Sequence, residues 1–159
     1  MTDEHFTEVY RAFMADMYRL AFSYLRNPSD AENIVQDIFL RYYLSPPKNE
    51  ESLKSYLMSS VRNGCLDELR RRKREKETLE SMAHDPSMNQ SEDGSRKAEN
   101  LLLLIGRLPE KYGAVIRMRY YSDMSVKEIS EALGITESNI KKRLERGKKM
   151  LKEMLEAKK

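Results

Sequence analysis

The segment 125–144, SVKEISEALGITESNIKKRL, constrains the fold most, because it predicts two short helices joined by a tight turn. Ser125 and Glu128 match the S-x-x-E capping box that begins a helix. Gly134 stands where the end of a helix needs a residue that accepts a positive φ, and Thr136 can cap the second helix. This pattern favours a helix-turn-helix, a motif whose second helix enters the major groove of DNA.

The rest of the chain also carries a helical pattern. Only six Gly and five Pro occur in 159 residues, too few for the many turns of a sandwich or barrel. Apolar residues recur at three- and four-residue steps within 4–26, 29–43, from about 50 past 70, 98–107 and 110–121. Ser29 and Glu32 repeat the capping box before the second of these helices. We therefore predict an all-α fold.

One segment interrupts the periodicity. Residues 83–96, AHDPSMNQSEDGSR, are rich in Ser, Asn, Asp, Gly and Pro, which is typical of a linker. We predict two small helical domains, 1–82 and 98–159, joined by a flexible linker at 83–97. The helix-turn-helix then belongs to the C-terminal domain.

The charges are distributed unevenly along the chain. Residues 1–45 contain four Arg and seven acids, residues 62–76 contain seven Lys or Arg and three acids, and residues 98–159 contain fourteen and nine. This distribution favours one acidic surface for a protein partner and two basic surfaces for nucleic acid. Solvated helix faces remain an alternative interpretation of each charged run.

Neither an active site nor a cofactor site is predicted. His5 and His84 are the only histidines, and no Gly-rich phosphate loop or metal-ligand cluster accompanies them. The single cysteine, Cys65, excludes an intramolecular disulfide and is expected to be a small core residue. We find no leader sequence and no apolar run of about 20 residues, so we expect a cytoplasmic protein without a membrane segment.

Two basic helices could contact DNA. Asn and Arg near the start of the second helix of the helix-turn-helix can reach base edges, and the later Lys and Arg can hold phosphates. The basic helix at 62–74 is the second candidate. Tyr56 precedes it by about two turns, where it could stack on an unpaired base, although a buried core role is the expected one.

Taken in order, these features resemble the small extracytoplasmic-function sigma factors of bacterial RNA polymerase over nearly the whole chain. The segment 30–43, DAENIVQDIFLRYY, is similar to the region of that family that docks on the polymerase β′ coiled coil. The segment 52–74 is similar to the family's promoter-melting and −10-reading helices, and 108–151 to its −35-reading domain.

The resemblance implies three sets of contact residues. The set for core polymerase is Asn33, Gln36 and Asp37. The set for the −10 element is Arg62, Asn63, Asp67, Arg70 and Arg71. The set for the −35 element is Thr136, Ser138, Asn139, Lys141, Lys142, Arg143 and Arg146.

Three positions depart from the family's pattern. The family often has an acid at the position of Asn33, many members have Trp at that of Tyr56, and Ala is more usual at that of Gly147. A Gly in a helix interior costs about 1 kcal/mol. Gly147 therefore marks either a close helix approach or a frayed end.

The function that the resemblance implies is promoter-specific transcription initiation without an enzymatic step. Its partners would be core RNA polymerase, through the β′ coiled coil and the β flap, promoter DNA, and an anti-sigma factor. The alternatives are a stand-alone helix-turn-helix regulator and a helical interaction protein with no nucleic-acid role. The stand-alone regulator would dimerise on a palindrome with half-sites about one DNA turn apart.

Overall fold

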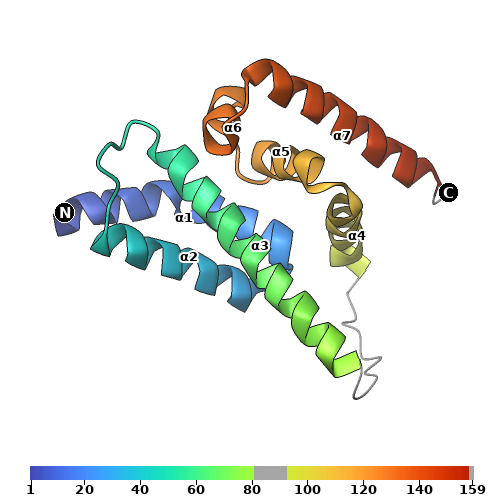
Figure 1. Ribbon diagram of the computed structural model, residues 1–159, viewed down its shortest axis with the longest axis horizontal. Coiled ribbons are helices and arrows are strands. Elements are labelled where there is room, and N and C mark those ends of the chain that lie inside the picture. Colours follow the sequence, from blue (N-terminus) through green and yellow to red (C-terminus); the bar gives the residue numbers. More distant parts are fainter. Residues whose placement is uncertain (81–92, 158–159) are drawn as a thin grey trace.

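The computed structural model describes residues 1–80 and 93–157, which form seven helices and no strand (Figure 1). The N-terminal domain contains α1 (Asp3–Leu25), α2 (Pro28–Leu44) and α3 (Leu53–Glu80). The C-terminal domain contains α4 (Asp93–Arg107), α5 (Glu110–Tyr120), α6 (Val126–Leu133) and α7 (Glu137–Ala157). The prediction of an all-α chain with two helical domains is confirmed.

Two helix starts differ from the prediction. Asn27, and not Ser29, caps α2, because its Oδ1 accepts the Asp30 N–H at 3.0 Å while Pro28 fills the first turn. Helix α4 begins at Asp93, so residues 93–97 are helical and not linker. These residues, DGSRK, contain no large apolar side chain, and periodicity therefore could not reveal them. The remainder of the predicted linker, 83–92, lies outside the described residues.

In the N-terminal domain, α1 and α2 run antiparallel and α3 packs across both (Figure 1). Met17, Leu20, Phe39, Tyr42 and Leu57 are almost completely buried between them. Helix α3 continues through Asn63 and Gly64 without a break. This continuity matters for function because it places the basic end of α3 on a rigid extension of the core.

In the C-terminal domain, α5 packs against α7 and α6 closes the end of that pair. Val115, Met118, Ile129 and Ile140 form its core. Gly147 is buried, and a Cβ added there would lie 3.1 Å from Cγ1 of Ile116. Of the two interpretations of Gly147, the close helix approach is therefore the correct one.

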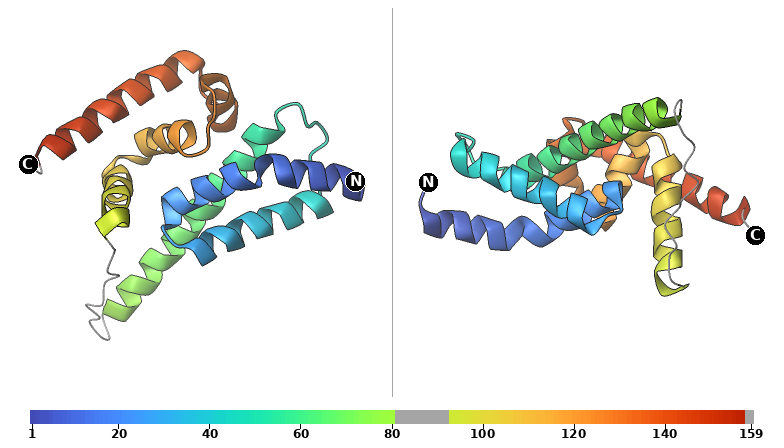
Figure 2. Two further views of the ribbon diagram at one scale, coloured as in Figure 1. Left: turned by 180° about the vertical axis from the view of Figure 1, so that it is seen from behind. Right: turned by 90° about the horizontal axis from the view of Figure 1, so that it is seen from below.

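The two domains pack against each other. Helix α6 lies beside the N-terminal half of α3, in agreement across the views of Figures 1 and 2. The buried hydrophobic residues of both domains form one continuous cluster. At its edge, Arg19 Nε donates to the Tyr121 carbonyl at 3.1 Å and Ser122 Oγ to the Asp16 carbonyl at 3.4 Å. The described chain is thus a closed, two-domain molecule.

Candidate nucleic-acid and polymerase interfaces

The helix-turn-helix forms as its local signals predict. Ser125 Oγ accepts the Glu128 N–H at 3.1 Å, and Glu128 Oε1 accepts the Ser125 N–H at 2.9 Å. Gly134 ends α6 with a φ of 70°, which favours glycine. Thr136 Oγ1 then accepts the Asn139 N–H at 3.2 Å. All three capping predictions are confirmed, and together they fix the direction in which α7 leaves the turn.

The N-terminal half of α7 carries the residues predicted to read the −35 element. Ile140, Leu144 and Gly147 face the core, and the opposite face is polar. Ser138, Lys141, Lys142 and Arg146 are exposed, Asn139 and Arg143 are partly exposed, and Thr136 occupies the cap. Among the residues that the structure describes, none of the four cations on this face pairs with a carboxylate. The face is therefore positively charged and unobstructed.

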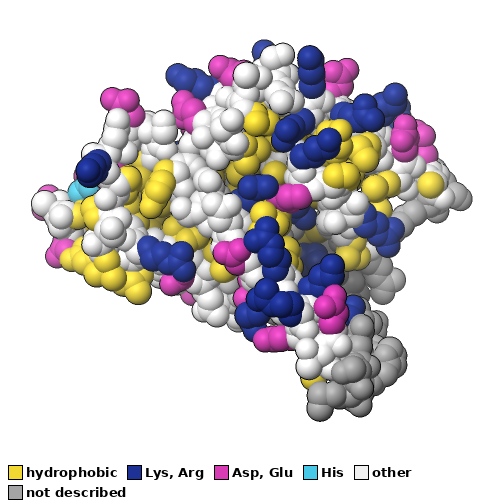
Figure 3. Space-filling model, in the orientation of Figure 1, with side chains coloured by type: hydrophobic (Ala, Val, Ile, Leu, Met, Phe, Trp, Pro, Cys, Tyr) yellow, Lys and Arg dark blue, Asp and Glu magenta, His cyan; other side chains and the backbone are white. Residues whose placement is uncertain are grey.

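The basic end of α3 carries acidic neighbours as well. Figure 3 shows Lys and Arg side chains along this half of α3, with acidic side chains between them. Arg70 Nη1 lies 2.8 Å from Asp67 Oδ1, and Arg71 bonds Glu68 and Glu75, both at 2.5 Å. The hydrogen bonds from Arg71 lower the pKa of Glu68. Exposed pairs of this kind contribute only about 0–1 kcal/mol each, so an incoming phosphate can replace the carboxylate.

Arg62 is oriented differently from the rest of the −10 set. Its Nε lies 2.8 Å from Glu110 Oε2, so the side chain faces the C-terminal domain and is only partly exposed. Asn63 is exposed beside it. Asn63 also lines an open pocket that Tyr56 and several serines of α3 border on one side and Glu131 and Ala132 of α6 on the other.

Tyr56 and Tyr120 both lie outside the core, so the buried role expected for Tyr56 is wrong. Tyr56 is 43% exposed, whereas the adjacent Ser55 is buried and donates to the Glu128 carbonyl of α6. Tyr120 is 56% exposed at the end of α5, where Lys148 of α7 lies 5.8 Å from the ring centre. The Tyr56 ring is therefore accessible for the stacking role considered above.

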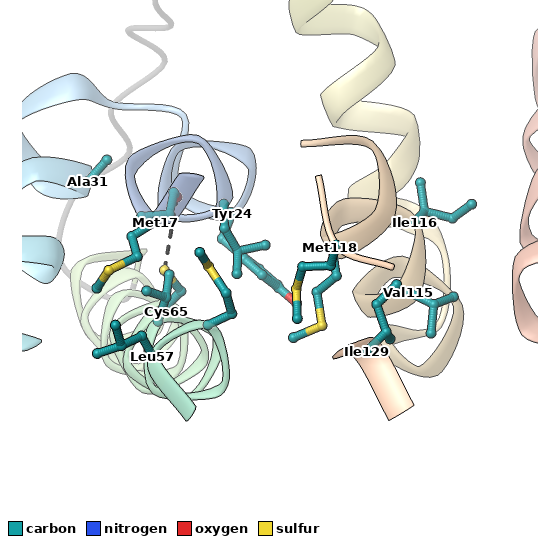
Figure 4. Close-up of a cluster of buried hydrophobic side chains, with 14 of the residues drawn as sticks. Met17, Tyr24, Ala31, Leu57, Cys65, Val115, Ile116, Met118 and Ile129 are labelled. Carbon is teal, nitrogen blue, oxygen red and sulfur yellow. Dashed lines mark hydrogen bonds between the residues drawn. The ribbon is translucent and has the colours of Figure 1, made fainter. Parts of the chain in front are cut away.

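Arg117 of α5 is a buried charged residue that lies where the two domains meet. Tyr24 extends from α1 toward Met118 of α5 (Figure 4), and its hydroxyl donates to Glu110 Oε2 at 2.8 Å. The guanidinium of Arg117 stacks 4.0 Å above the Tyr24 ring and bonds Glu110 Oε1 at 3.3 Å. Burial, followed by the nearby Glu110 charge, raises the pKa of Tyr24. Sequence reasoning missed Arg117, because an Arg within an apolar helix face is expected at the surface unless it has a partner.

The predicted polymerase-binding residues lie on the outer face of α2. Asn33, Gln36 and Asp37 are all exposed. Gln36 Nε2 donates to the Tyr10 hydroxyl at 3.3 Å, and Asp37 pairs with Arg41 at 2.6 Å. The structure thus brings the three residues to one accessible helix face.

An apolar patch continues this face. Leu40, Tyr43 and Leu44 are 56%, 42% and 71% exposed, and Figure 3 shows hydrophobic side chains gathered over the C-terminal end of α2. A group of exposed large apolar residues beside a polar face is typical of a protein-binding surface. The sequence offered a signal here, because Leu40 and Leu44 are four residues apart and outside the buried stripe.

The described residues meet neither the requirements of a metal site nor those of a membrane-spanning helix. They contain no group of His, Cys, Asp and Glu that could hold a metal ion. His5 Nε2 lies 2.7 Å from Glu50 Oε2, a contact that ties α1 to the loop before α3, and His84 is outside the described residues. No described helix combines the length and the apolarity needed to cross a bilayer.

Comparison with known families identifies both halves of the chain. Residues 9–75 match the model for sigma-70 region 2, and residues 98–151 match that for sigma-70 region 4. The RNA polymerase sigma factor SigV of Bacillus subtilis is 30% identical over 143 residues, 86% of this chain and 82% of that protein. The ECF RNA polymerase sigma factor SigM of the same organism is 28% identical over 149 residues, 91% of each chain.

Solved structures share the fold. The sigma factor RpoE of Bartonella quintana, in complex with the anti-sigma factor NepR, superposes with a TM-score of 0.73 at 20% identity, covering 98% of this chain and 99% of that one. CnrH, in complex with the cytosolic domain of CnrY, gives a TM-score of 0.78 at 16% identity, covering 99% and 92%. The similarity therefore includes both domains.

Proposed function

The chain belongs to the extracytoplasmic-function sigma factors of RNA polymerase, and from this membership we propose how its helices divide promoter recognition between them. As a member of this family it is a promoter-specific, non-enzymatic subunit and not a stand-alone regulator. The separate matches at 9–75 and 98–151 support the division into an N-terminal and a C-terminal domain, and the start of α4 at Asp93 extends the C-terminal one beyond the predicted 98–159.

Helix α7 reads the −35 element. The observation that supports this assignment is the exposed face of α7, whose cations have no carboxylate partner among the described residues. Ser138, Asn139 and Lys142 lie within the first two turns of α7, where a recognition helix contacts base edges. Arg146, one turn further along, is placed to hold a phosphate, which contributes affinity more than sequence preference.

Helix α3 contacts the −10 element. Asn63 and Tyr56 lie on its exposed side and line an open pocket together with several serines. An unpaired base can stack on an aromatic ring there and form hydrogen bonds with the amide and hydroxyl groups. Arg70 and Arg71 exchange their carboxylate partners for phosphates of the same strand.

Helix α2 binds core polymerase. Asn33, Gln36 and Asp37 supply polar contacts, and Leu40 and Leu44 supply the apolar area that stabilises a protein interface. The family's docking site for this face is the β′ coiled coil, and the C-terminal domain would bind the β flap. These partners place the protein in the cytoplasm.

An anti-sigma factor is a further partner. The structural neighbours RpoE and CnrH were both determined with a second protein, the anti-sigma factor NepR and the cytosolic domain of CnrY. Their shared fold supports an equivalent partner here, which would cover the surfaces assigned to polymerase.

Reconstitution tests this function. The purified chain is mixed with core RNA polymerase and a library of promoters, and transcripts are sequenced. We expect transcripts that begin downstream of a shared pair of elements, and none when the chain or the core is omitted. Tight binding of the chain alone to a palindrome, with no core complex, would contradict the proposal.

A further inference from the structure

We propose that the carboxylate of Glu50, held by Tyr42 and His5, fixes the start of α3 in the position from which this helix contacts the −10 strand. The inference rests on the proposed −10 role of α3 and adds positioning residues that do not touch DNA. These three residues, called the Glu50 cluster below, join the first turns of α1, the end of α2 and the segment 45–52. All three elements meet at one end of the N-terminal domain (Figure 1).

The Glu50 carboxylate is the centre of the cluster. Its Oε1 accepts from the Tyr42 hydroxyl at 2.5 Å, and its Oε2 lies 2.7 Å from His5 Nε2. The Tyr42 hydroxyl also lies 3.3 Å from His5 Nε2, so each side chain contacts the other two. The hydrogen bond from Tyr42 lowers the pKa of Glu50 against the opposing effect of burial, and His5 lowers it further. The carboxylate is therefore a charged acceptor that two helices hold at once.

Both partners of Glu50 are held by their own surroundings. Tyr42 is 1% exposed, and its ring stacks on that of Phe6 with 6.4 Å between the ring centres. The backbone N–H of His5 donates to the capping Thr2 Oγ1 at 3.1 Å. Because the core fixes Tyr42 and the helix cap fixes His5, neither can follow Glu50 if the segment 45–52 moves. The cluster thus works as an anchor for this segment.

The segment 45–52 has little else to hold it. All of its side chains are exposed except those of Pro47 and Glu50, which are partly buried. The bond from the Glu51 N–H to Asn49 Oδ1, 2.8 Å, stays within the segment. In the part of the chain that the structure describes, Glu50 makes the segment's only side-chain hydrogen bonds to α1 or α2. The position of the segment therefore depends on Glu50.

A short backbone path leads from Glu50 to Tyr56. The Glu50 carbonyl accepts the N–H of Leu53, the first residue of α3, at 3.2 Å. The Ser52 carbonyl accepts the Tyr56 N–H at 2.9 Å, and both residues line the open pocket assigned to the −10 strand. The buried side chains of Leu53 and Leu57 hold the opposite side of this turn. Loss of the Glu50 anchor would therefore shift the exposed side of the turn, which carries the Tyr56 ring.

Stacking makes the −10 contact sensitive to such a shift. A base stacked on an aromatic ring is worth about 1–3 kcal/mol, and the contact is lost when the ring is displaced. Residues that lock the position of a binding side chain control affinity in the same way as the side chain itself. The Glu50 cluster is such a support for Tyr56.

The test uses holoenzyme formed from the full chain and core polymerase. The probe is a promoter recovered in the reconstitution, with 2-aminopurine, whose fluorescence reports stacking, placed in turn at each non-template position of the −10 element. Tyr56→Ala identifies the position that stacks on this ring. We expect Tyr42→Phe and Glu50→Ala to change the fluorescence at that same position, although the Tyr56 ring is intact in both.

Promoter affinity is the second measurement. Tyr42→Phe and Glu50→Ala should each weaken binding by about three- to tenfold, the equivalent of one hydrogen bond. Tyr18→Phe on α1 and the exposed Glu51→Ala are the matched controls and should stay within about twofold.

A conservative change at His5 separates positioning from a general structural effect. His5→Gln keeps a side-chain N–H donor for Glu50 and should retain most of the affinity, whereas His5→Ala should behave like Glu50→Ala. Thermal unfolding of each variant should show that the fold persists, because Tyr42→Phe keeps its ring in the core and Glu50 lies at the surface.

The outcomes distinguish this inference from the promoter function. Unchanged fluorescence and affinity in both Tyr42→Phe and Glu50→Ala overturn the inference, even if the holoenzyme transcribes. An equal change at every labelled position, shared by Glu51→Ala, overturns it as well. No response to Tyr56→Ala removes that ring from the −10 contact and the inference with it, while core-dependent transcription still decides the promoter function by itself.

Discussion

Gly147 of α7 and Ile116 of α5 are in such close contact that a Cβ at position 147 would lie 3.1 Å from Cγ1 and 3.3 Å from Cδ1 of the isoleucine. This contact sets how closely the recognition helix packs on the domain core. A slightly larger residue at 147 would push α7 outward and shift its DNA-reading end.

Gly147→Ala is therefore expected to destabilise the protein, although alanine is the better helix former. The gain in helix propensity is about 1 kcal/mol, whereas overpacking a core contact costs about 1–3 kcal/mol. Urea unfolding should show a lower midpoint for the variant.

Gly106→Ala on α4 is the matched control, since its added Cβ would meet only the Arg117 Nη2 atom at 3.9 Å. That variant should be neutral or more stable. A Gly147→Ala protein as stable as Gly106→Ala would show that the close approach does not constrain α7.

Cys65 should be inert in the folded protein. Burial raises the pKa of its thiol to about 12, and the side chain packs against α1 with the Ala21 carbonyl 3.9 Å from Sγ. At pH 8 only a minute fraction is thiolate, and that fraction is shielded from reagent. Alkylation, followed by mass spectrometry, should be slow in buffer and complete in denaturant, and rapid native labelling would contradict the burial.

Helix α7 should determine −35 preference without affecting polymerase binding. Lys142→Ala or Arg143→Ala is expected to weaken transcription from promoters with the preferred −35 element, by about 1–3 kcal/mol if a base contact is lost. Lys152→Ala, exposed near the other end of α7, is the control and should leave preference unchanged. Loss of core binding in a folded Lys142→Ala variant would contradict this separation of roles.

Substitutions on α2 should weaken polymerase binding and leave −35 preference unchanged. Gln36→Ala combined with Asp37→Ala is expected to weaken association with core polymerase at least tenfold, while stability changes by only about 0.5 kcal/mol because the Asp37–Arg41 pair is exposed. Size-exclusion chromatography with core measures the first quantity and thermal unfolding the second. Glu32→Gln, also exposed on α2, is the charge control. Unchanged core binding in the double variant would remove these residues from the interface.

Local signals in the sequence predicted the helix-turn-helix correctly. The Ser125–Glu128 box, the positive φ of Gly134 and the Thr136 cap all depend on residues within one or two turns of each other. Asn27 was missed because Ser29 offers an equally plausible cap, and only the position of Pro28 in the first turn decides between them.

Contacts between the domains could not be predicted, because they depend on packing across many residues of sequence separation. Arg117 is buried against α1, where its guanidinium contacts the Tyr24 ring and the Ser23 carbonyl, while Glu110 of its own helix accepts a further hydrogen bond. A basic residue such as Arg62 is expected at a DNA contact, but in the structure its side chain pairs with Glu110 of the C-terminal domain. The structure shows where the residues of the three predicted contact sets lie, and their roles stay predictions.

The central claim, that two domains of one polymerase-bound chain read two promoter elements, is tested most directly by varying the spacing between those elements. Transcription by the reconstituted holoenzyme is measured on promoters whose −10 and −35 elements are moved apart or together one base pair at a time. We expect activity to peak at one spacing and to fall steeply on either side, with no transcription without core polymerase. Activity that is indifferent to the spacing, or that survives replacement of either element, would contradict the account.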